Sequence, residues 1–471
     1  MTEYNYDLLV IGSGPGGQSA ALHAASLGKQ VGLIERKPYL GGVSLQTGTI
    51  PSKALREAAY LASRFSSRGM RDAGQIRDQL HSGFLSEAVA RKQAVIDRHE
   101  RLLLNQLMSH GVTLLPGEAG FIDAHTLKLC NSHGEALQLS AAVIVLATGS
   151  RPRRPENVPF DKERVLDSTS ILQMRHLPQR MTIIGGGVIA CEFATIFAPL
   201  GVAVSLVDSH EHLLAYLDED IQQTLEQDLL DMGVQLHMQT RIKQIERQGE
   251  RVLLETDAGV NLETDVALYA LGRVPNYDGL ELDAAGIDAD DQGWVRINEH
   301  HQTSREHVYI IGDLAGRPSL ASTAMEQGRL AVNHAFDRDH AAAAGQLPMA
   351  IYTIPELSYV GNTERELQQQ GIDYVVGSAR FSQTARGQII GEERGFMKLL
   401  VDRNSRALLG VHIIGESASE LVHIGQMAMN CGAGVDVLAN TVYNYPTLAH
   451  CYKNAALDCL QQLPGSGNQS I

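Results

Sequence analysis

The sequence predicts an α/β protein that contains two successive strand–turn–helix–strand units. Each unit opens with a short apolar run, residues 7–11 and 181–184, and a glycine-rich turn follows each run directly. A helical pattern and a second apolar run come next, and that run ends in an acidic residue, Glu35 or Asp208. A glycine triad predicts a nucleotide-binding turn only in this context. We therefore interpret both units as Rossmann-like dinucleotide-binding folds.

In the first unit, each glycine of the triad has its own task. Gly12 allows the tight turn, Gly14 lets the backbone approach a pyrophosphate, and Gly17 lets the following helix pack closely on the strand. The N-terminus of that helix offers amide donors and a positive dipole to the phosphates. Glu35 stands where a carboxylate accepts hydrogen bonds from the ribose hydroxyls of adenosine.

The second unit repeats this design with Gly185 and Gly187, and Ala190 replaces the third glycine, of which only close packing is required. Asp208 ends its second strand, where an acid favours the free ribose hydroxyls of NAD and repels the 2′-phosphate of NADP. His210 and His212 follow, and when protonated they could donate to that phosphate. A plain polar loop is the alternative, so both interpretations stay open.

Three further segments resemble parts of flavoproteins. Residues 308–313 form an apolar strand that ends in Gly312-Asp313, and this segment resembles the one whose aspartate binds the ribityl chain of FAD. Residues 147–152, with Thr148 and Gly149, and residues 272–276, with Arg273, resemble the crossover segments between an FAD domain and an NAD domain. This resemblance implies that FAD binds the first unit and a nicotinamide dinucleotide binds the second.

Residues 41–53 resemble the redox-disulfide segment of the flavin disulfide reductases, in which two cysteines lie five positions apart beside the flavin. Here Ser44 and Thr49 stand at the two cysteine positions. A hydroxyl forms neither a disulfide nor a low-pKa thiolate, so electrons that reach a flavin have no thiol relay by which to leave. The resemblance also implies that Arg36, Gly41, Gly42 and Ser44 contribute to the FAD site.

The order of the motifs resembles, over nearly the whole chain, the soluble Si-specific pyridine nucleotide transhydrogenases of this flavoprotein family. Those enzymes also keep the Gly-Thr-Ile-Pro-Ser-Lys sequence of residues 48–53 without the cysteine pair. The resemblance implies a homodimer with four segments. They are the first part of the FAD domain (1–150), the NAD(P) domain (151–272), the second part of the FAD domain (273–345) and an α+β dimerisation domain (346–471).

The family resemblance singles out two candidate catalytic residues, Lys53 and Glu192. In the family such a lysine lies beside the flavin and pairs with a glutamate from the first helix of the nicotinamide domain. A cation near the flavin stabilises the negative charge that reduction brings. The alternative is a lysine and a glutamate without contact. Tyr445 and His450 replace the family's His–Glu dyad, and His450 is either a structural histidine or a modified proton donor.

The composition of the chain indicates which binding partners and which cellular location to expect. The net charge of −15 argues against general binding of nucleic acid or of anionic membranes. No signal-like or membrane-spanning run is evident, so we expect a cytoplasmic protein. The five cysteines (Cys130, Cys191, Cys431, Cys451 and Cys459) form neither a disulfide framework nor a zinc pattern, and no metal site is expected.

The resulting functional hypothesis is FAD-dependent hydride transfer between NADPH and NAD⁺, by a ping-pong route through the reduced flavin and without a redox disulfide. One alternative is an FAD-dependent NADH diaphorase or oxidase that uses quinone or oxygen. Another is a non-catalytic, flavin-bound redox sensor or scaffold. The preferred nucleotide, the physiological direction and any assembly larger than a dimer are not determined by the sequence.

Overall fold

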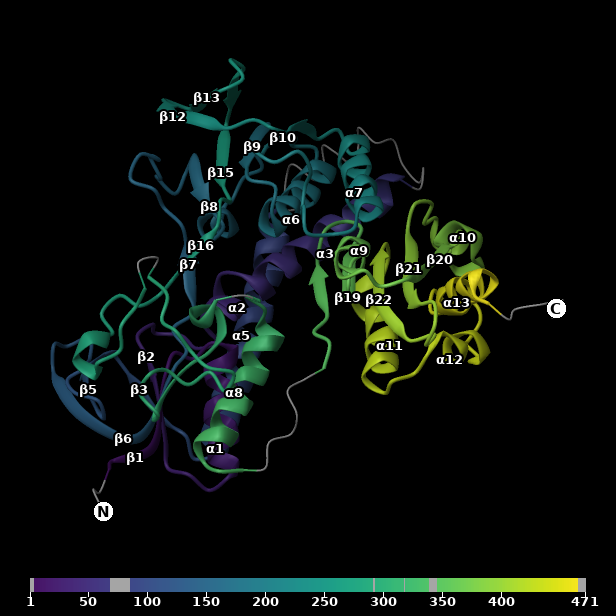
Figure 1. The fold of residues 1–471 in the computed structure, drawn as a ribbon. Helices are drawn as coiled ribbons and strands as arrows, with labels where there is room; N and C mark the ends of the chain where they lie inside the picture. Colours follow the sequence, from purple (N-terminus) through teal and green to yellow (C-terminus); the bar gives the residue numbers. More distant parts are fainter. Residues whose placement is uncertain (1–3, 68–84, 291–292, 317, 339–344, 465–471) are drawn as a thin grey trace.

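A computed structural model describes residues 4–67, 85–290, 293–316, 318–338 and 345–464 (Figure 1). Three large sheets, of seven, five and five strands, organise these residues, and Figure 1 shows them as a lower left, an upper and a right-hand region. The prediction of two Rossmann-like units followed by an α+β C-terminal region is confirmed.

The first sheet has the strand order β3-β2-β1-β6-β5-β4, and β17 also pairs with β6. Its strands are β1 (Tyr6–Ile11), β2 (Val31–Glu35), β3 (Thr113–Pro116), β4 (Glu118–Phe121), β5 (Thr126–Cys130), β6 (Ala136–Leu146) and β17 (Val308–Ile310). The pairs β1–β2, β2–β3, β1–β6 and β6–β17 are parallel, whereas β4, β5 and β6 pair antiparallel. The apolar residues of β1 are buried because helices cover this parallel part of the sheet.

Helices α1 (Pro15–Ser26) and α8 (Ala321–Ala335) pack against each other beside this sheet. A side chain at Gly328 of α8 would meet the carbonyl oxygen of Gly16 at 2.5 Å, so the two helices touch backbone to backbone. The same region contains α2 (Gly42–Gln46), α3 (Thr49–Ser67) and α5 (Leu85–Ser109). Residues 68–84, between α3 and α5, lie outside the described residues.

The second sheet is parallel, with the order β11-β10-β9-β15-β8. Its strands are β8 (Val165–Asp167), β9 (Arg180–Ile184), β10 (Ala203–Val207), β11 (Gln235–His237) and β15 (Val266–Tyr269). Helices α6 (Val188–Phe197) and α7 (Glu219–Asp231) accompany it, and an antiparallel extension consists of β12 (Ile242–Gln248), β13 (Arg251–Thr256) and β14 (Asn261–Thr264). Helix α6 ends at Phe197, and the chain continues as a 3-10 turn, Ala198–Leu200, which contains Pro199.

Two short strands connect the first two regions. β7 (Ser150–Pro152) pairs antiparallel with β16 (Arg273–Pro275), so the two predicted crossover segments lie side by side. The backbone N–H of Asn276 donates to the carbonyl of Gly149 at 2.9 Å, which extends this contact. The chain then returns to the first sheet, where Val308 of β17 lies opposite Ile144 of β6.

The third sheet is antiparallel, with the order β18-β19-β22-β21-β20. Its strands are β18 (Met349–Ile351), β19 (Leu357–Gly361), β20 (Tyr374–Arg380), β21 (Phe396–Asp402) and β22 (Leu408–Ile414). The accompanying helices are α9 (Glu364–Gln370), α10 (Ala385–Ile390), α11 (Ala418–Asn430), α12 (Val435–Asn440) and α13 (His450–Gln462). Further 3-10 turns cover Ser170–Gln173, Leu282–Ala285, Gly312–Ala315 and Phe381–Gln383.

A buried charge cluster joins the third region to the second. Lys398 of β21 is 2% exposed and forms ion pairs with Asp218 at 2.9 Å, Asp220 at 2.7 Å and Glu364 at 2.9 Å. Because Asp218 and Asp220 border and begin α7, this cluster ties the second region to the third. A buried ammonium is tolerated here because several carboxylates surround it.

Among the described helices, none is both long enough and apolar enough to cross a bilayer.

Candidate active site

The first glycine turn requires its glycines for measurable steric reasons. Gly12 has φ +106°, and a Cβ there would lie 2.4 Å from the carbonyl oxygen of Ala147. A Cβ on Gly17 would meet the carbonyl oxygen of Gly12 at 1.9 Å, so the close approach of α1 to this turn depends on Gly17. A Cβ on Gly14 would meet nothing within 4 Å. The space beside Gly14 is therefore open to a ligand.

Glu35, at the end of β2, is held by the turn itself. Its Oε2 accepts from the backbone N–H of Ser13 at 3.0 Å and from the Ser13 hydroxyl at 2.7 Å, and its Oε1 accepts from the Lys37 N–H at 2.9 Å. The Ser13 hydroxyl also accepts from the backbone N–H of Gly41 at 3.0 Å. Ser13 thus links three predicted site segments, a role for which the sequence carried no signal.

A cavity of about 360 Å³ brings most of the predicted FAD residues together. The predicted residues that line it are Gly12, Gly14, Glu35, Arg36, Gly42, Ser44, Thr148, Gly149, Gly312 and Asp313. Gly17, Gly41 and Arg273 lie outside this lining. Open space beside Gly14, the N-terminus of α1 and the carboxylates of Glu35 and Asp313 fit a dinucleotide that has a pyrophosphate and several hydroxyls.

Asp313 and Arg273 meet through Ser150. The Ser150 hydroxyl donates to Asp313 at 2.6 Å, while Arg273 donates to the Ser150 hydroxyl and to its carbonyl, both at 2.8 Å. Burial lowers the pKa of Arg273, and the nearby Asp313 opposes that shift. Arg273 therefore anchors the crossover strands.

Lys53 and Glu192 form a close ion pair, so the alternative of no contact is wrong. The Lys53 Nζ lies 2.9 Å from Oε1 and 2.8 Å from Oε2 of Glu192, and the two side chains are 26% and 7% exposed. Tyr352 completes the group, because its backbone N–H donates to Glu192 Oε1 at 3.0 Å and its ring centroid lies 4.7 Å from the Lys53 Nζ. Tyr352 was not among the predicted site residues.

A second cavity, of about 490 Å³, surrounds this ion pair. Arg273 lines it, as do Val188 and Ile189 of the second glycine unit. Thr49 and Asp313 line both this cavity and the first one, so the two cavities adjoin. A flavin held at the first unit and a nicotinamide held at the second would therefore meet between Thr49 and Lys53.

No cysteine is among the described residues that line the two cavities at this junction. Ser44 lines the first cavity and Thr49 lines both. All five cysteines are free. Burial raises the pKa of Cys191, and it raises the pKa of Cys451 and of Cys459 to about 12, so these thiols stay protonated at neutral pH.

The second glycine turn matches the first in conformation. Gly185 has φ +119°, a Cβ on Gly187 would meet nothing within 4 Å, and Ala190 is fully buried against the core. Asp208 accepts from the backbone N–H of Gly186 at 2.5 Å through Oδ2. Its Oδ1 accepts from His210, from the backbone N–H at 2.7 Å and from the ring Nδ1 at 2.6 Å. The His212 ring lies against Glu226 instead, at 3.3 Å.

Tyr445 and His450 contact each other edge to face, with ring centroids 6.0 Å apart. Neither residue lines the two cavities. The His450 Nδ1 is buried without a hydrogen-bond partner in the described part of the chain. Within the same residues, no group of three or more His, Cys, Asp or Glu side chains could hold a metal ion.

Comparisons with known proteins agree with this arrangement. The family described as "Pyridine nucleotide-disulphide oxidoreductase" matches residues 6–328, and the dimerisation domain of the same family matches residues 347–456. The chain is 41% identical to a "Soluble pyridine nucleotide transhydrogenase" from Mycobacterium bovis over 97% of this chain and 98% of the relative. It is also 41% identical to a protein of that name from Vibrio atlanticus, over 98% of this chain and 99% of the relative.

Solved structures share the whole fold. LpdA from Mycobacterium tuberculosis superposes with a TM-score of 0.87 at 28% identity and covers 96% of this chain and 99% of its own. The flavoprotein disulfide reductase RclA from Escherichia coli gives a TM-score of 0.86 at 25% identity, with the same coverage of both chains. The chain therefore belongs to the pyridine nucleotide-disulphide oxidoreductase family of flavoproteins and groups there with the soluble pyridine nucleotide transhydrogenases.

Proposed function

We propose that this chain is a soluble NAD(P)⁺ transhydrogenase that uses bound FAD to move hydride between NADPH and NAD⁺. The observation that supports this most is the junction of the two cavities. A flavin cavity and a nicotinamide cavity adjoin beside Lys53 and Glu192, and hydroxyl residues stand where a disulfide reductase has cysteines. Relatives with the transhydrogenase name, at 41% identity over nearly the full length, support the same activity.

FAD, when bound, would supply the chemistry, because it exchanges hydride with nicotinamides in either direction. The chain's own residues bind and align the two partners. The first glycine turn, Glu35 and Asp313 would hold FAD, and the second turn with Ala190 and Asp208 would hold the nicotinamide dinucleotide. Alignment lowers the barrier because it removes the entropic cost of bringing the two rings together.

Lys53 would provide positive charge where reduction places negative charge. The Lys53 side chain is only 26% exposed, so the field of its charge is screened less than that of a fully exposed lysine. Glu192 orients this ammonium through both of its oxygens, and Tyr352 fixes Glu192 through a backbone N–H. We assign Lys53 as the catalytic residue and Glu192 as its partner.

The two nucleotides would use one site in turn. The cavity beside Lys53 is lined by residues of only one nicotinamide-binding unit, Val188 and Ile189 among them. Oxidised product must leave before the second nucleotide enters, so ping-pong kinetics are expected. The absence of a thiol at Ser44 and Thr49 means that no disulfide substrate is required to complete turnover.

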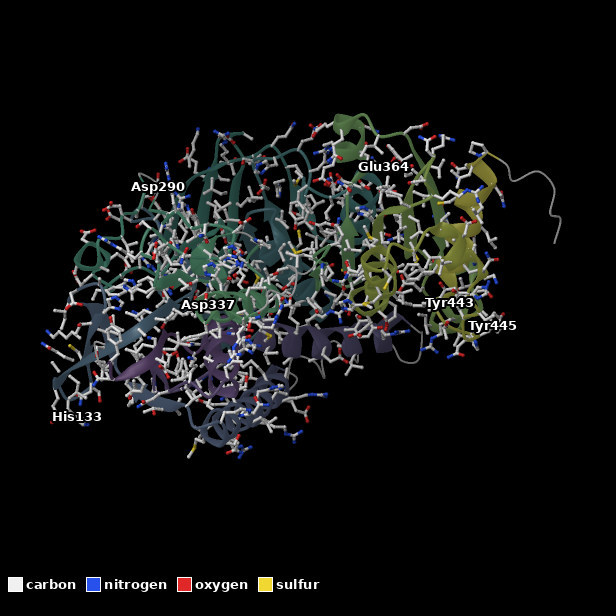
Figure 2. All side chains as sticks on the ribbon, turned by 60° about the horizontal axis from the view of Figure 1, so that its bottom comes forward. His133, Asp290, Asp337, Glu364, Tyr443 and Tyr445 are labelled. Carbon is white, nitrogen blue, oxygen red and sulfur yellow. The ribbon has the colours of Figure 1, made fainter. Side chains whose placement is uncertain are left out.

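We also propose that the chain works as a homodimer. Residues 347–456 match a dimerisation domain, and several large apolar side chains in this region are exposed. These are Met427, Val437, Val442 and Tyr445. Tyr445 is 72% exposed and lies at the edge of the molecule in Figure 2. Burying such side chains against a second copy would be favourable.

The test is NADPH-driven reduction of thio-NAD⁺ by FAD-loaded protein, with oxygen uptake followed in parallel. Rapid transfer with little oxygen uptake, and parallel lines in double-reciprocal plots, are the expected results. Rapid oxygen uptake or quinone reduction with little transfer would instead identify a diaphorase or oxidase. Failure of both nucleotides to bleach the flavin would identify a non-catalytic sensor or scaffold.

A further inference from the structure

A third cavity, of about 270 Å³, lies at the carboxyl ends of the strands of the second sheet. Ile184, Val207 and Tyr269, which end β9, β10 and β15, line it together with Asp208. Strand β9 lies between β10 and β15. The chain passes from β9 to β10 on one side and adds β15 on the other side only later, so the strand order reverses at β9. Open parallel sheets bind their ligands at such a switch point.

This cavity and the one beside Lys53 border the same glycine turn. Ile184 directly precedes Gly185 and lines the third cavity, whereas Val188 directly follows Gly187 and lines the Lys53 cavity. A dinucleotide with its pyrophosphate at the N-terminus of α6 would reach both cavities. Its nicotinamide would lie by Lys53, and its adenosine would lie in the third cavity.

Asp208 alone would disfavour a phosphorylated adenosine here, but its carboxylate is already engaged. It is 6% exposed and accepts from the Gly186 N–H, the His210 N–H and the His210 ring. Hydrogen bonds to a carboxylate disperse its charge over the donors. A 2′-phosphate in this cavity would meet a satisfied carboxylate, and it would need a separate source of positive charge.

Arg241 and Lys243 line the same cavity and can supply that charge. Lys243 is the second residue of β12 and Arg241 directly precedes that strand, whose register with β13 shifts between Ile242 and Gln244. Such a bulge leaves a residue out of the regular pairing and redirects the side chains around it, which is common beside binding sites. Consecutive residues, Arg241 to Ile245, accordingly line the cavity.

The charges further along the same hairpin make these two cations distinctive. Arg247 pairs with Asp161 at 2.7 Å, and Arg251 of β13 pairs with Asp265 at 2.7 Å. In the described part of the chain, by contrast, no ion pair engages the guanidinium of Arg241 or the ammonium of Lys243. Arg247 and Arg251, which lie further along the hairpin, are thus neutralised by carboxylates. Arg241 and Lys243, which line the cavity, have no such ion pair among the described residues.

We propose that Arg241 and Lys243 form the subsite for the adenosine 2′-phosphate and so admit NADP(H) to a site whose Asp208 would otherwise select NAD(H). The inference rests on the proposed function, since it assigns the second nucleotide of that reaction. Two cations that face a phosphate form charge-assisted hydrogen bonds, and arginine can donate two at once. The adenosine of NAD(H) would use the same cavity without these contacts.

The test measures binding to FAD-loaded, full-length protein by titration calorimetry. The probes are 2′,5′-ADP, which carries the 2′-phosphate, and 5′-AMP, which lacks it. Arg241→Gln and Lys243→Gln should each weaken 2′,5′-ADP by about tenfold and change 5′-AMP by less than about twofold. Lys162→Gln is the control, because Lys162 is an exposed lysine of the same domain that does not line the cavity.

Three results would overturn the subsite. They are wild-type protein that does not bind 2′,5′-ADP, variants that bind it with unchanged affinity, and an equal loss in Lys162→Gln. Transfer from NADPH to thio-NAD⁺, measured on the same preparations, separates this inference from the proposed function. If the wild type transfers hydride and the variants bind 2′,5′-ADP as tightly as the wild type, only the proposed subsite is contradicted. If the variants selectively lose 2′,5′-ADP binding but the wild type shows no hydride transfer, the proposed transhydrogenase activity is contradicted and the subsite is retained.

Discussion

At the scale of single residues, Lys53 and Glu192 depend on each other. Glu192 is 7% exposed, and burial of an unpaired carboxylate is costly, so its charge requires Lys53. Lys53 in turn is held at the cavity by both oxygens of Glu192 and by the face of the Tyr352 ring. Neither residue can be replaced without disturbing the other.

Replacing Lys53 tests the charge at the junction. Lys53→Met should slow NADPH-driven bleaching of the flavin by about a hundredfold, since a fixed charge that stabilises the product state is lost. Glu192→Gln keeps the side-chain size and should slow bleaching less, because Lys53 keeps its charge but loses its orientation. Stopped-flow absorbance measures both rates. Equal rates in wild type and Lys53→Met would show that Lys53 has no catalytic role.

Blocking the accessible thiols tests the claim that none of them takes part. Iodoacetamide should react with exposed Cys431, while Cys191, Cys451 and Cys459 are buried and their pKa values are raised. Hydride transfer by the alkylated protein should remain within about twofold of the untreated value. Alkylated Cys431→Ser protein is the control for modification at the exposed site. A large loss of transfer in that variant would place a thiol in the reaction.

At the scale of elements, the two glycine turns offer a reciprocal test of which unit holds which dinucleotide. Gly14 and Gly187 both have negative φ and open space where a Cβ would project. Alanine at either position is therefore compatible with the fold, but it occupies the space that we assign to a pyrophosphate. Gly14→Ala should purify with less FAD, and Gly187→Ala should keep FAD and bind 5′-AMP about tenfold more weakly.

The two variants serve as controls for each other. Flavin content is measured from the visible absorbance of the purified protein, 5′-AMP binding by calorimetry, and folding by thermal unfolding. Loss of FAD from Gly187→Ala with normal FAD in Gly14→Ala would reverse the assignment of the two units.

A buried histidine beside the Lys398 cluster predicts a pH dependence of stability. Burial lowers the pKa of His412 below its ordinary value of 6.5, while Asp218 raises it and Lys398 lowers it further. Its Nε2 donates to the Asn362 carbonyl at 2.8 Å, and its ring stacks on Tyr359. His412 is therefore neutral in the folded chain and takes up a proton on unfolding below about pH 6.5.

The sign follows from this difference in proton binding. The stability that His412 contributes is fully present above about pH 6.5 and is lost as the pH falls toward its lowered pKa, at up to about 1.4 kcal/mol per pH unit. Urea unfolding should show a weaker fall in the free energy of unfolding below about pH 6.5 for His412→Gln than for wild type. Exposed His133, labelled in Figure 2, gives the control His133→Gln. Parallel pH profiles for wild type and His412→Gln would contradict the prediction.

At the scale of the whole molecule, the sequence predicted the elements that have local signals. Glycine triads, apolar runs and terminal acids identified the parallel part of the first sheet and the parallel second sheet, and the order of motifs identified the family. The Lys53–Glu192 contact followed from the family resemblance, because the two residues are far apart in the sequence. The domain limits at residues 150, 272 and 345 remain a proposal. Pairing of β17 with β6 supports the return of the third segment to the first sheet.

Long-range contacts of ordinary residues could not be predicted. Ser13 is one small polar residue within a glycine triad, and its three-way link depends on where Gly41 folds back. Arg241 and Lys243 occur in a charged strand that looks like any exposed hairpin, and only the cavity distinguishes them from Arg247. The engagement of Asp208 by Gly186 is likewise a property of the folded turn.

The most direct test of the account separates the two half-reactions in the absence of oxygen. NADPH is added to the FAD-loaded protein, the nucleotide is removed by gel filtration, and NAD⁺ is then added while the visible spectrum is recorded. We predict that NADPH bleaches the flavin without a long-wavelength thiolate charge-transfer band, and that NAD⁺ alone restores the yellow spectrum with formation of NADH. Restoration that requires NADPH and NAD⁺ together, or a charge-transfer band in the bleached protein, would contradict hydride transfer through the flavin without a thiol.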